Sequence, residues 1–143
     1  MAPGGGSSGV TAPGRILVVE DDESLREALL EALADEGHEV RVAAHGAEAL
    51  ETLETPDAWE PELLVLDLMM PVMDAFEFRE HQRQRAVAPA ARVLVLSAAR
   101  ELGGAAERLG ADAYLAKPFR LDEMLTTVER LLDDHRAEDT AAR

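Results

Sequence analysis

The chain has 143 residues, enough for one domain with a hydrophobic core but too few for two of ordinary size. Its formal net charge of −15 repels phosphate backbones and anionic lipids, which argues against direct binding to nucleic acid or to a membrane surface. The absence of cysteine excludes disulfides and thiolate metal sites, and without a membrane-spanning apolar run or a signal peptide a cytoplasmic protein is expected.

The two ends of the chain differ in composition from its middle. Residues 1–14 are mostly Gly, Pro, Ser and Ala and carry too little apolar surface to offset the entropy of ordering, which predicts a disordered leader. Residues 135–143 are polar or small and are expected to form a frayed tail. One domain is therefore predicted over residues 15–134.

Within this domain, strand and helix patterns alternate five times. Continuous apolar runs predict buried strands, an alternating run predicts a half-exposed edge strand, and the strands are expected in this order: 16–19, 40–42 (the edge strand), 63–66, 93–96 and 113–116. Helical spacing of apolar residues follows each strand, at 25–36, 46–54, 76–85, 100–109 and 121–132. This alternation predicts an α/β domain, a doubly wound five-stranded parallel sheet with helices on both faces.

Polar side chains follow four of the predicted strands. Asp67 comes directly after four apolar residues, and because an ionised carboxylate is costly to bury, it should emerge at the carboxyl edge of the sheet, where open α/β sheets bind ligands. Glu20 and Asp21 follow the first strand, which neighbours the third in a sheet of order 2-1-3-4-5. Three carboxylates so close together cannot all stay ionised unless a cation joins them. Oxygen ligands without His or Cys favour Mg²⁺, with Mn²⁺ possible.

Each of these residues also has a simpler interpretation. The acidic run that begins at Glu20 could stabilise the start of the following helix. Asp67 could turn the chain, Ser97 could cap a helix, and Lys117 could be a solvated side chain in a turn. The coincidence of polar residues at four different strand ends favours a common site over four separate roles.

The chain resembles the receiver domains of two-component response regulators. The matching segments are residues 17–22, 66–74, 95–98 and 110–119. The resemblance covers about Arg15 to Asp134 and implies a flavodoxin-like (βα)5 receiver fold with the strand order given above.

The resemblance implies a role for each strand-end residue. Asp67 resembles the phosphoacceptor, and Glu20 and Asp21 resemble the acidic pair that holds Mg²⁺ together with Asp67. The backbone carbonyl of Met69 resembles another metal ligand.

Three further residues resemble the part of a receiver that responds to the phosphoryl group. Ser97 would bond a phosphoryl oxygen, and Lys117 would balance its charge. Tyr114 stands at the aromatic switch position, which is expected to couple to Ser97. The Lys117–Pro118 peptide bond is expected to be cis.

Two features depart from the family pattern. Ala75 stands where these domains usually have Gly, so the backbone there must avoid a left-handed conformation or adopt it at a cost. Gly103 and Gly104 interrupt the predicted fourth helix, which makes the partner-binding face less regular.

The sequence thus predicts a response regulator receiver that accepts a phosphoryl group on Asp67 from a histidine kinase or a phosphotransfer histidine. It is expected to be a phosphoacceptor signalling domain, not an enzyme, without an output domain in this chain. A downstream protein is expected to bind the face formed by the fourth helix, the fifth strand and the fifth helix.

Two other function classes stay open. A Mg²⁺-dependent phosphatase with an aspartyl nucleophile usually has a second Asp two residues later, where this chain has Met69. A binding module that works without phosphorylation would not need the complete acidic cluster.

Overall fold

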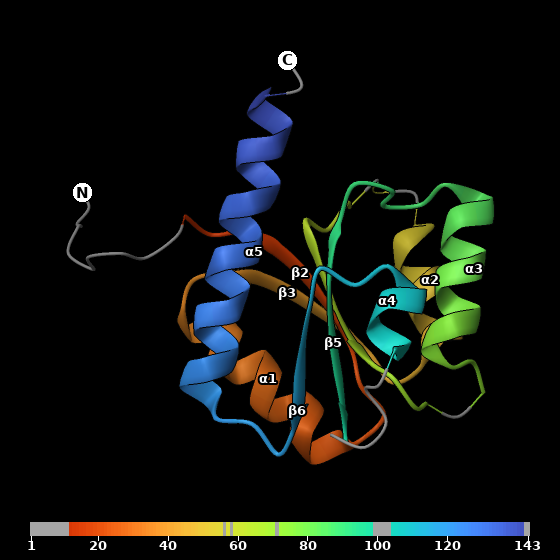
Figure 1. Cartoon of the computed structure of the whole chain (residues 1–143), viewed down its shortest axis with the longest axis horizontal. Helices are drawn as coiled ribbons and strands as arrows, with labels where there is room; N and C mark the ends of the chain where they lie inside the picture. The colour runs from red at the N-terminus through yellow and green to blue at the C-terminus, as the bar shows by residue number, and fades with distance from the viewer. Residues whose placement is uncertain (1–11, 56, 58, 71, 99–103, 142–143) are drawn as a thin grey trace.

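The computed structural model describes residues 12–55, 57, 59–70, 72–98 and 104–141. Its strands are β2 (Arg15–Val19), β3 (Glu39–Ala43), β4 (Leu63–Asp67), β5 (Arg92–Ala98) and β6 (Ala113–Lys117). Its helices are α1 (Glu23–Asp35), α2 (Gly46–Leu53), α3 (Ala75–Arg85), α4 (Ala105–Leu109) and α5 (Leu121–Ala141). The parallel sheet has the order β3-β2-β4-β5-β6, which confirms the predicted order 2-1-3-4-5 (Figure 1).

The sheet lies between two layers of helices (Figure 1). The central strand β4 is buried along its whole length, as its unbroken apolar run predicted. Its side chains alternate between two cores: Leu64 and Leu66 pack toward α2, α3 and α4, whereas Leu63 and Val65 pack toward α1 and α5. Both faces of β4 are therefore covered, and its carboxyl end is the place where a polar side chain can leave the core.

Helix α5 extends past residue 134, where the predicted domain ends and a frayed tail was expected. Arg136 explains part of this extension, because its Nε atom lies 3.3 Å from Glu62 Oε2 and its Nη2 atom donates to the Pro13 carbonyl oxygen at 3.0 Å. The next residue, Gly14, is buried and donates its N–H to His38 Nδ1 at 3.0 Å. Tertiary contacts thus reach both ends of the predicted domain; residues 1–11 of the predicted leader lie outside the described residues.

The two departures from the family pattern have different outcomes. Ala75 is the first residue of α3 and does not have a positive φ. Asp74 caps the helix and accepts the Glu77 N–H at 2.9 Å, so the chain enters α3 without a left-handed residue at this position. A positive φ of 68° occurs instead at Val72. Helix α4 begins only after Gly104, and residues 100–103 of the predicted fourth helix lie outside the described part of the chain.

No helix in the described part of the chain is long and apolar enough to cross a membrane.

Ala86→Gly is expected to stabilise the fold by about 0.5–1 kcal/mol. Ala86 ends α3 in the left-handed conformation (φ 54°, ψ 41°) and is exposed, so glycine relieves the backbone without losing packing. Urea denaturation followed by the fluorescence of Trp59, the single tryptophan, measures the change. The matched control is Ala137→Gly in the body of α5, which should lower the free energy of unfolding by about 1 kcal/mol. An equal loss of stability in both variants would contradict the prediction.

Candidate functional site

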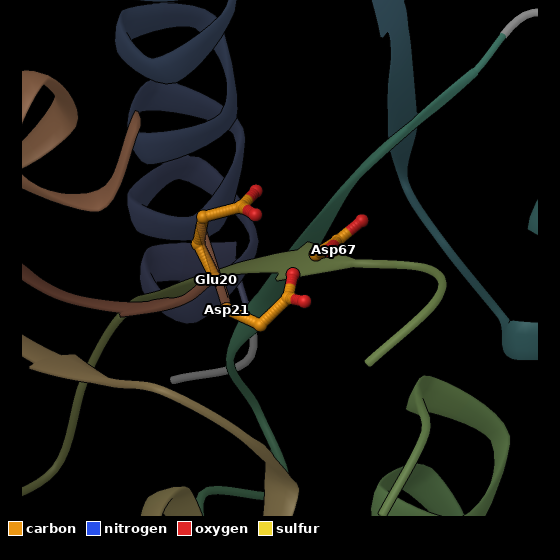
Figure 2. Close-up of side chains that lie close together, drawn as sticks. All are labelled: Glu20, Asp21 and Asp67. Atoms are coloured by element: carbon orange, nitrogen blue, oxygen red, sulfur yellow. The ribbon is translucent and has the colours of Figure 1, made fainter. Parts of the chain in front are cut away.

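Three carboxylates meet at the carboxyl edge of the sheet. Register pairs Val19 of β2 with Leu66 of β4, so the residues that follow them, Glu20 and Asp67, lie at the ends of adjacent strands. One carboxylate oxygen from each of Glu20, Asp21 and Asp67 lies within 4.8 Å of the others. Figure 2 shows the three side chains grouped at these two strand ends. The convergence predicted from the strand ends is therefore present.

Lys117 brings a positive charge to this cluster from the end of β6. Its Nζ atom donates to Glu20 Oε1 at 3.0 Å and to Asp67 Oδ1 at 3.4 Å. Both carboxylates are buried, whereas Asp21 is exposed. Three carboxylates and one ammonium group leave two formal negative charges, which a divalent cation would neutralise. The donor set, made of hard oxygen atoms, fits Mg²⁺ or Mn²⁺.

The crowding changes the protonation of the acids. Burial, the hydrogen bond with Asp21 and the charge of Glu20 raise the pKa of Asp67 to about 8. The same hydrogen bond with Asp67 lowers the pKa of Asp21. Burial alone would lower the pKa of Lys117, but its contacts with Glu20 and Asp67 outweigh burial and raise it, so the lysine stays charged. Without a metal ion, the site therefore holds a proton on Asp67 at neutral pH.

The loop after β2 fixes the buried acid of the cluster. The Glu20 N–H donates to the Ala43 carbonyl oxygen at 3.0 Å, continuing the hydrogen bonding between β2 and β3. Glu20 Oε2 accepts the Asp22 N–H at 3.1 Å, and Asp22 in turn caps α1 by accepting the Leu25 N–H at 3.0 Å. The Glu20 carboxylate is thus held by Lys117 on one oxygen and by the loop on the other.

The remaining predicted residues lie on β5, on β6 and just after β4, and they differ in burial. Ser97 is buried on β5, one residue beyond Leu96, which pairs with Asp67. Tyr114 lies on the neighbouring strand β6 with 59% of its surface exposed. Met69, two residues after Asp67, is 56% exposed. The Lys117–Pro118 peptide bond is cis, as the family resemblance implied.

An apolar groove adjoins the cluster and was not predicted from the sequence. It has a volume of about 440 Å³, and its lining residues are Leu25, Ala28, Lys117, Pro118, Phe119 and Leu121. From apolar spacing alone, the leucines of the first helix were expected to lie in the core. The packing of α1 beside the loop that precedes α5 leaves part of this apolar face of α1 open. Lys117 connects the groove with the acidic cluster.

The sheet order and the acidic carboxyl edge define the CheY-like class of α/β domain. The model of the family described as "Response regulator receiver domain" matches residues 16–129, and the chain belongs to this family. It is 39% identical over 129 residues to the response regulator MprA of Mycobacterium tuberculosis, an alignment that covers 89% of this chain and 54% of MprA. The chain thus spans about half the length of the curated relatives it matches.

Solved structures show the same fold. The chemotaxis response regulator CheY4 of Vibrio cholerae is 30% identical, with a TM-score of 0.74 over 84% of this chain and 99% of that one. A CheY-like response regulator receiver domain protein from Methanospirillum hungatei is 27% identical, with a TM-score of 0.77 over 89% of this chain and 99% of that one.

The raised pKa of Asp67 makes stability depend on pH when no divalent cation is present. The folded state keeps a proton on Asp67 up to about pH 8, whereas the unfolded chain loses it near pH 4, so stability contributed by this group falls as pH rises between these values. Asp67→Asn removes this titration. In EDTA, its stability relative to the parent should therefore be higher at about pH 8 than at about pH 5, by roughly 1–3 kcal/mol.

Urea denaturation at both pH values measures this difference, and comparison with the parent cancels titrations that the two proteins share. A stability difference that does not change with pH would contradict the raised pKa.

Proposed function

We propose that this chain is a phosphorelay receiver that accepts a phosphoryl group on Asp67 from a histidine kinase or a phosphotransfer protein. The observation that carries the proposal is the convergence of Glu20, Asp21 and Asp67 with Lys117 at one edge of a receiver fold. Because a histidine kinase draws its phosphoryl group from ATP, we place this exchange in the cytoplasm.

Asp67 is the nucleophile of the proposed reaction. One of its carboxylate oxygens attacks the phosphorus atom, the bond from phosphorus to the donor's imidazole nitrogen breaks, and its electron pair stays on that nitrogen. The product is an acyl phosphate on Asp67. Lys117, already in contact with Asp67, balances the charge on one phosphoryl oxygen, and the Ser97 hydroxyl donates to another.

The acidic cluster supplies the metal ligands. Glu20, Asp21, Asp67 and the backbone carbonyl of Met69 would hold Mg²⁺, with Mn²⁺ as a substitute. When bound, the ion neutralises charge on the carboxylates and on the phosphoryl group being transferred. Ionised Asp67 is the form required both as ligand and as nucleophile.

The phosphodonor would dock on the apolar groove beside Lys117. Leu25 and Ala28 of α1 line this groove together with Phe119 and Leu121, and an apolar helical surface of a partner could cover them. The position supports this role, because Lys117 both lines the groove and contacts Asp67. A donor bound there would bring its histidine close to the acceptor carboxylate.

The response is a shift between two conformations. A phosphoryl group on Asp67 would draw the Ser97 hydroxyl toward it, and the exposed Tyr114 ring would turn inward on the adjacent strand. The changed surface would be the face of α4, β6 and α5, where a downstream protein binds. NMR signals of Tyr114 should shift on phosphorylation; an unchanged ring environment would contradict this coupling.

Incubation with acetyl phosphate and Mg²⁺, followed by intact mass spectrometry, tests the function. We expect the gain of one phosphoryl group, and none when EDTA removes the metal ion. A binding module would gain no phosphoryl group under either condition. A phosphatase would instead release inorganic phosphate continuously from small phosphoesters.

A further inference from the structure

Arg26 of α1 contacts the backbone of both residues of the acidic pair. Its Nη1 atom donates to the Glu20 carbonyl oxygen at 2.9 Å and approaches the Asp21 carbonyl oxygen at 3.5 Å. The backbone N–H of Arg26 donates to the Asp22 carbonyl oxygen at 2.8 Å. One arginine is thus linked to three consecutive residues of the loop between β2 and α1.

The contact from Arg26 matters more for Asp21 than for Glu20. Glu20 is buried, and its carboxylate is already held by Lys117 and by the Asp22 N–H. Asp21 is exposed, and its carboxylate is hydrogen-bonded to the neighbouring acids Asp67 and Glu20 and to its own backbone. The direction of the Asp21 side chain therefore depends on the backbone of the loop, which the Arg26 guanidinium holds through two carbonyl oxygens.

We infer that Arg26 is a positioning residue for the metal site. It holds the loop so that Asp21 faces Asp67 before a metal ion binds, which raises the affinity for Mg²⁺. The inference rests on the proposed function, since it concerns the same acidic cluster. Arg26 itself donates to carbonyl oxygens and does not take part in the chemistry.

A purely structural role makes a different prediction. If Arg26 only satisfied two carbonyl groups at the end of β2, its loss would lower the free energy of unfolding and leave Mg²⁺ affinity in the folded protein unchanged. A positioning role predicts weaker Mg²⁺ binding by molecules that are still folded. Groups that orient metal ligands typically change affinity by about 10–100-fold.

The test compares Arg26→Gln and Arg26→Lys with the parent in the full chain. Isothermal titration with MgCl₂ gives the affinity, and the Mg²⁺ concentration for half-maximal phosphorylation by acetyl phosphate gives a second reading. Arg26→Gln should need about tenfold more Mg²⁺ but reach the parental rate at saturation. Arg26→Lys keeps the charge with a single compact donor, and its Mg²⁺ affinity should fall about threefold. If Arg26→Gln does not fold, Arg26→Lys tests the same inference.

Arg83→Gln on α3 is the matched control, because it makes the same charge change at an exposed ion pair with Glu80. Its Mg²⁺ affinity should stay within about twofold of the parent. Unchanged Mg²⁺ requirements in both Arg26 variants would overturn this inference while leaving the proposed function intact. A parent chain that binds no Mg²⁺ would overturn both.

Discussion

Asp67→Asn is expected to lower phosphoryl uptake from acetyl phosphate by at least about a thousandfold, which in practice means no detectable product. The amide keeps the shape of the side chain but has no anionic oxygen to attack phosphorus. The fold should persist, because removing one acid from a crowded cluster relieves repulsion in the metal-free protein. Intact mass spectrometry measures uptake, and urea denaturation checks the fold.

The matched control for this variant is Asp74→Asn. Asp74 caps α3 at the same edge of the sheet, and asparagine caps a helix about as well as aspartate. It should take up one phosphoryl group as the parent does. If Asp67→Asn still gained one phosphoryl group at the same rate, a different residue would be the acceptor and the proposed function would need another nucleophile.

Asp21→Asn should have the second-largest effect, in this case on metal binding. Replacing an anionic oxygen ligand with a neutral one should weaken Mg²⁺ binding by about 10–100-fold, so phosphorylation would need correspondingly more metal ion. In EDTA, the same variant should be at least as stable as the parent, because one of three neighbouring negative charges is gone. Isothermal titration with MgCl₂ and urea denaturation measure the two effects.

The neighbouring residue offers a close control for Asp21. Asp22→Asn removes the same charge one position away, but its side chain caps α1 and its backbone N–H, which binds Glu20, is unchanged. Its Mg²⁺ affinity should fall by less than about threefold, the effect of a nearby screened charge. Similar losses in both variants would mean that Asp21 acts through general charge and is not a ligand.

The sequence by itself determined the sheet and the place of the acidic cluster. Unbroken apolar runs such as Leu63–Leu66 can only be buried on both faces, which specifies the central strands of a parallel sheet. The carboxyl ends of parallel strands share one edge, so Asp67 and the acids after β2 had to meet there once the strand order was known. Both inferences use local patterns that burial imposes on consecutive residues.

The partners of the polar side chains depended on the tertiary structure. Lys117 reaches Glu20 across 97 positions of sequence, and Arg136 reaches Glu62 across 74, so no local pattern could assign these pairs. The contact of Arg26 with the Glu20 backbone spans only six residues, but on a helix with one apolar face this arginine looks like an ordinary solvated side chain.

The protonation of Asp67 was also beyond the sequence. Its raised pKa comes first from burial and then from the neighbouring acids, and both depend on how closely β2 and β4 bring their ends together. Likewise, the apolar spacing of α5 ends before residue 135, but the helix continues, in part because Arg136 contacts the Glu62 carboxylate and the Pro13 carbonyl oxygen. Periodicity indicates which face of an element is buried. The partner of a polar group, in contrast, depends on groups distant in sequence that folding brings beside it.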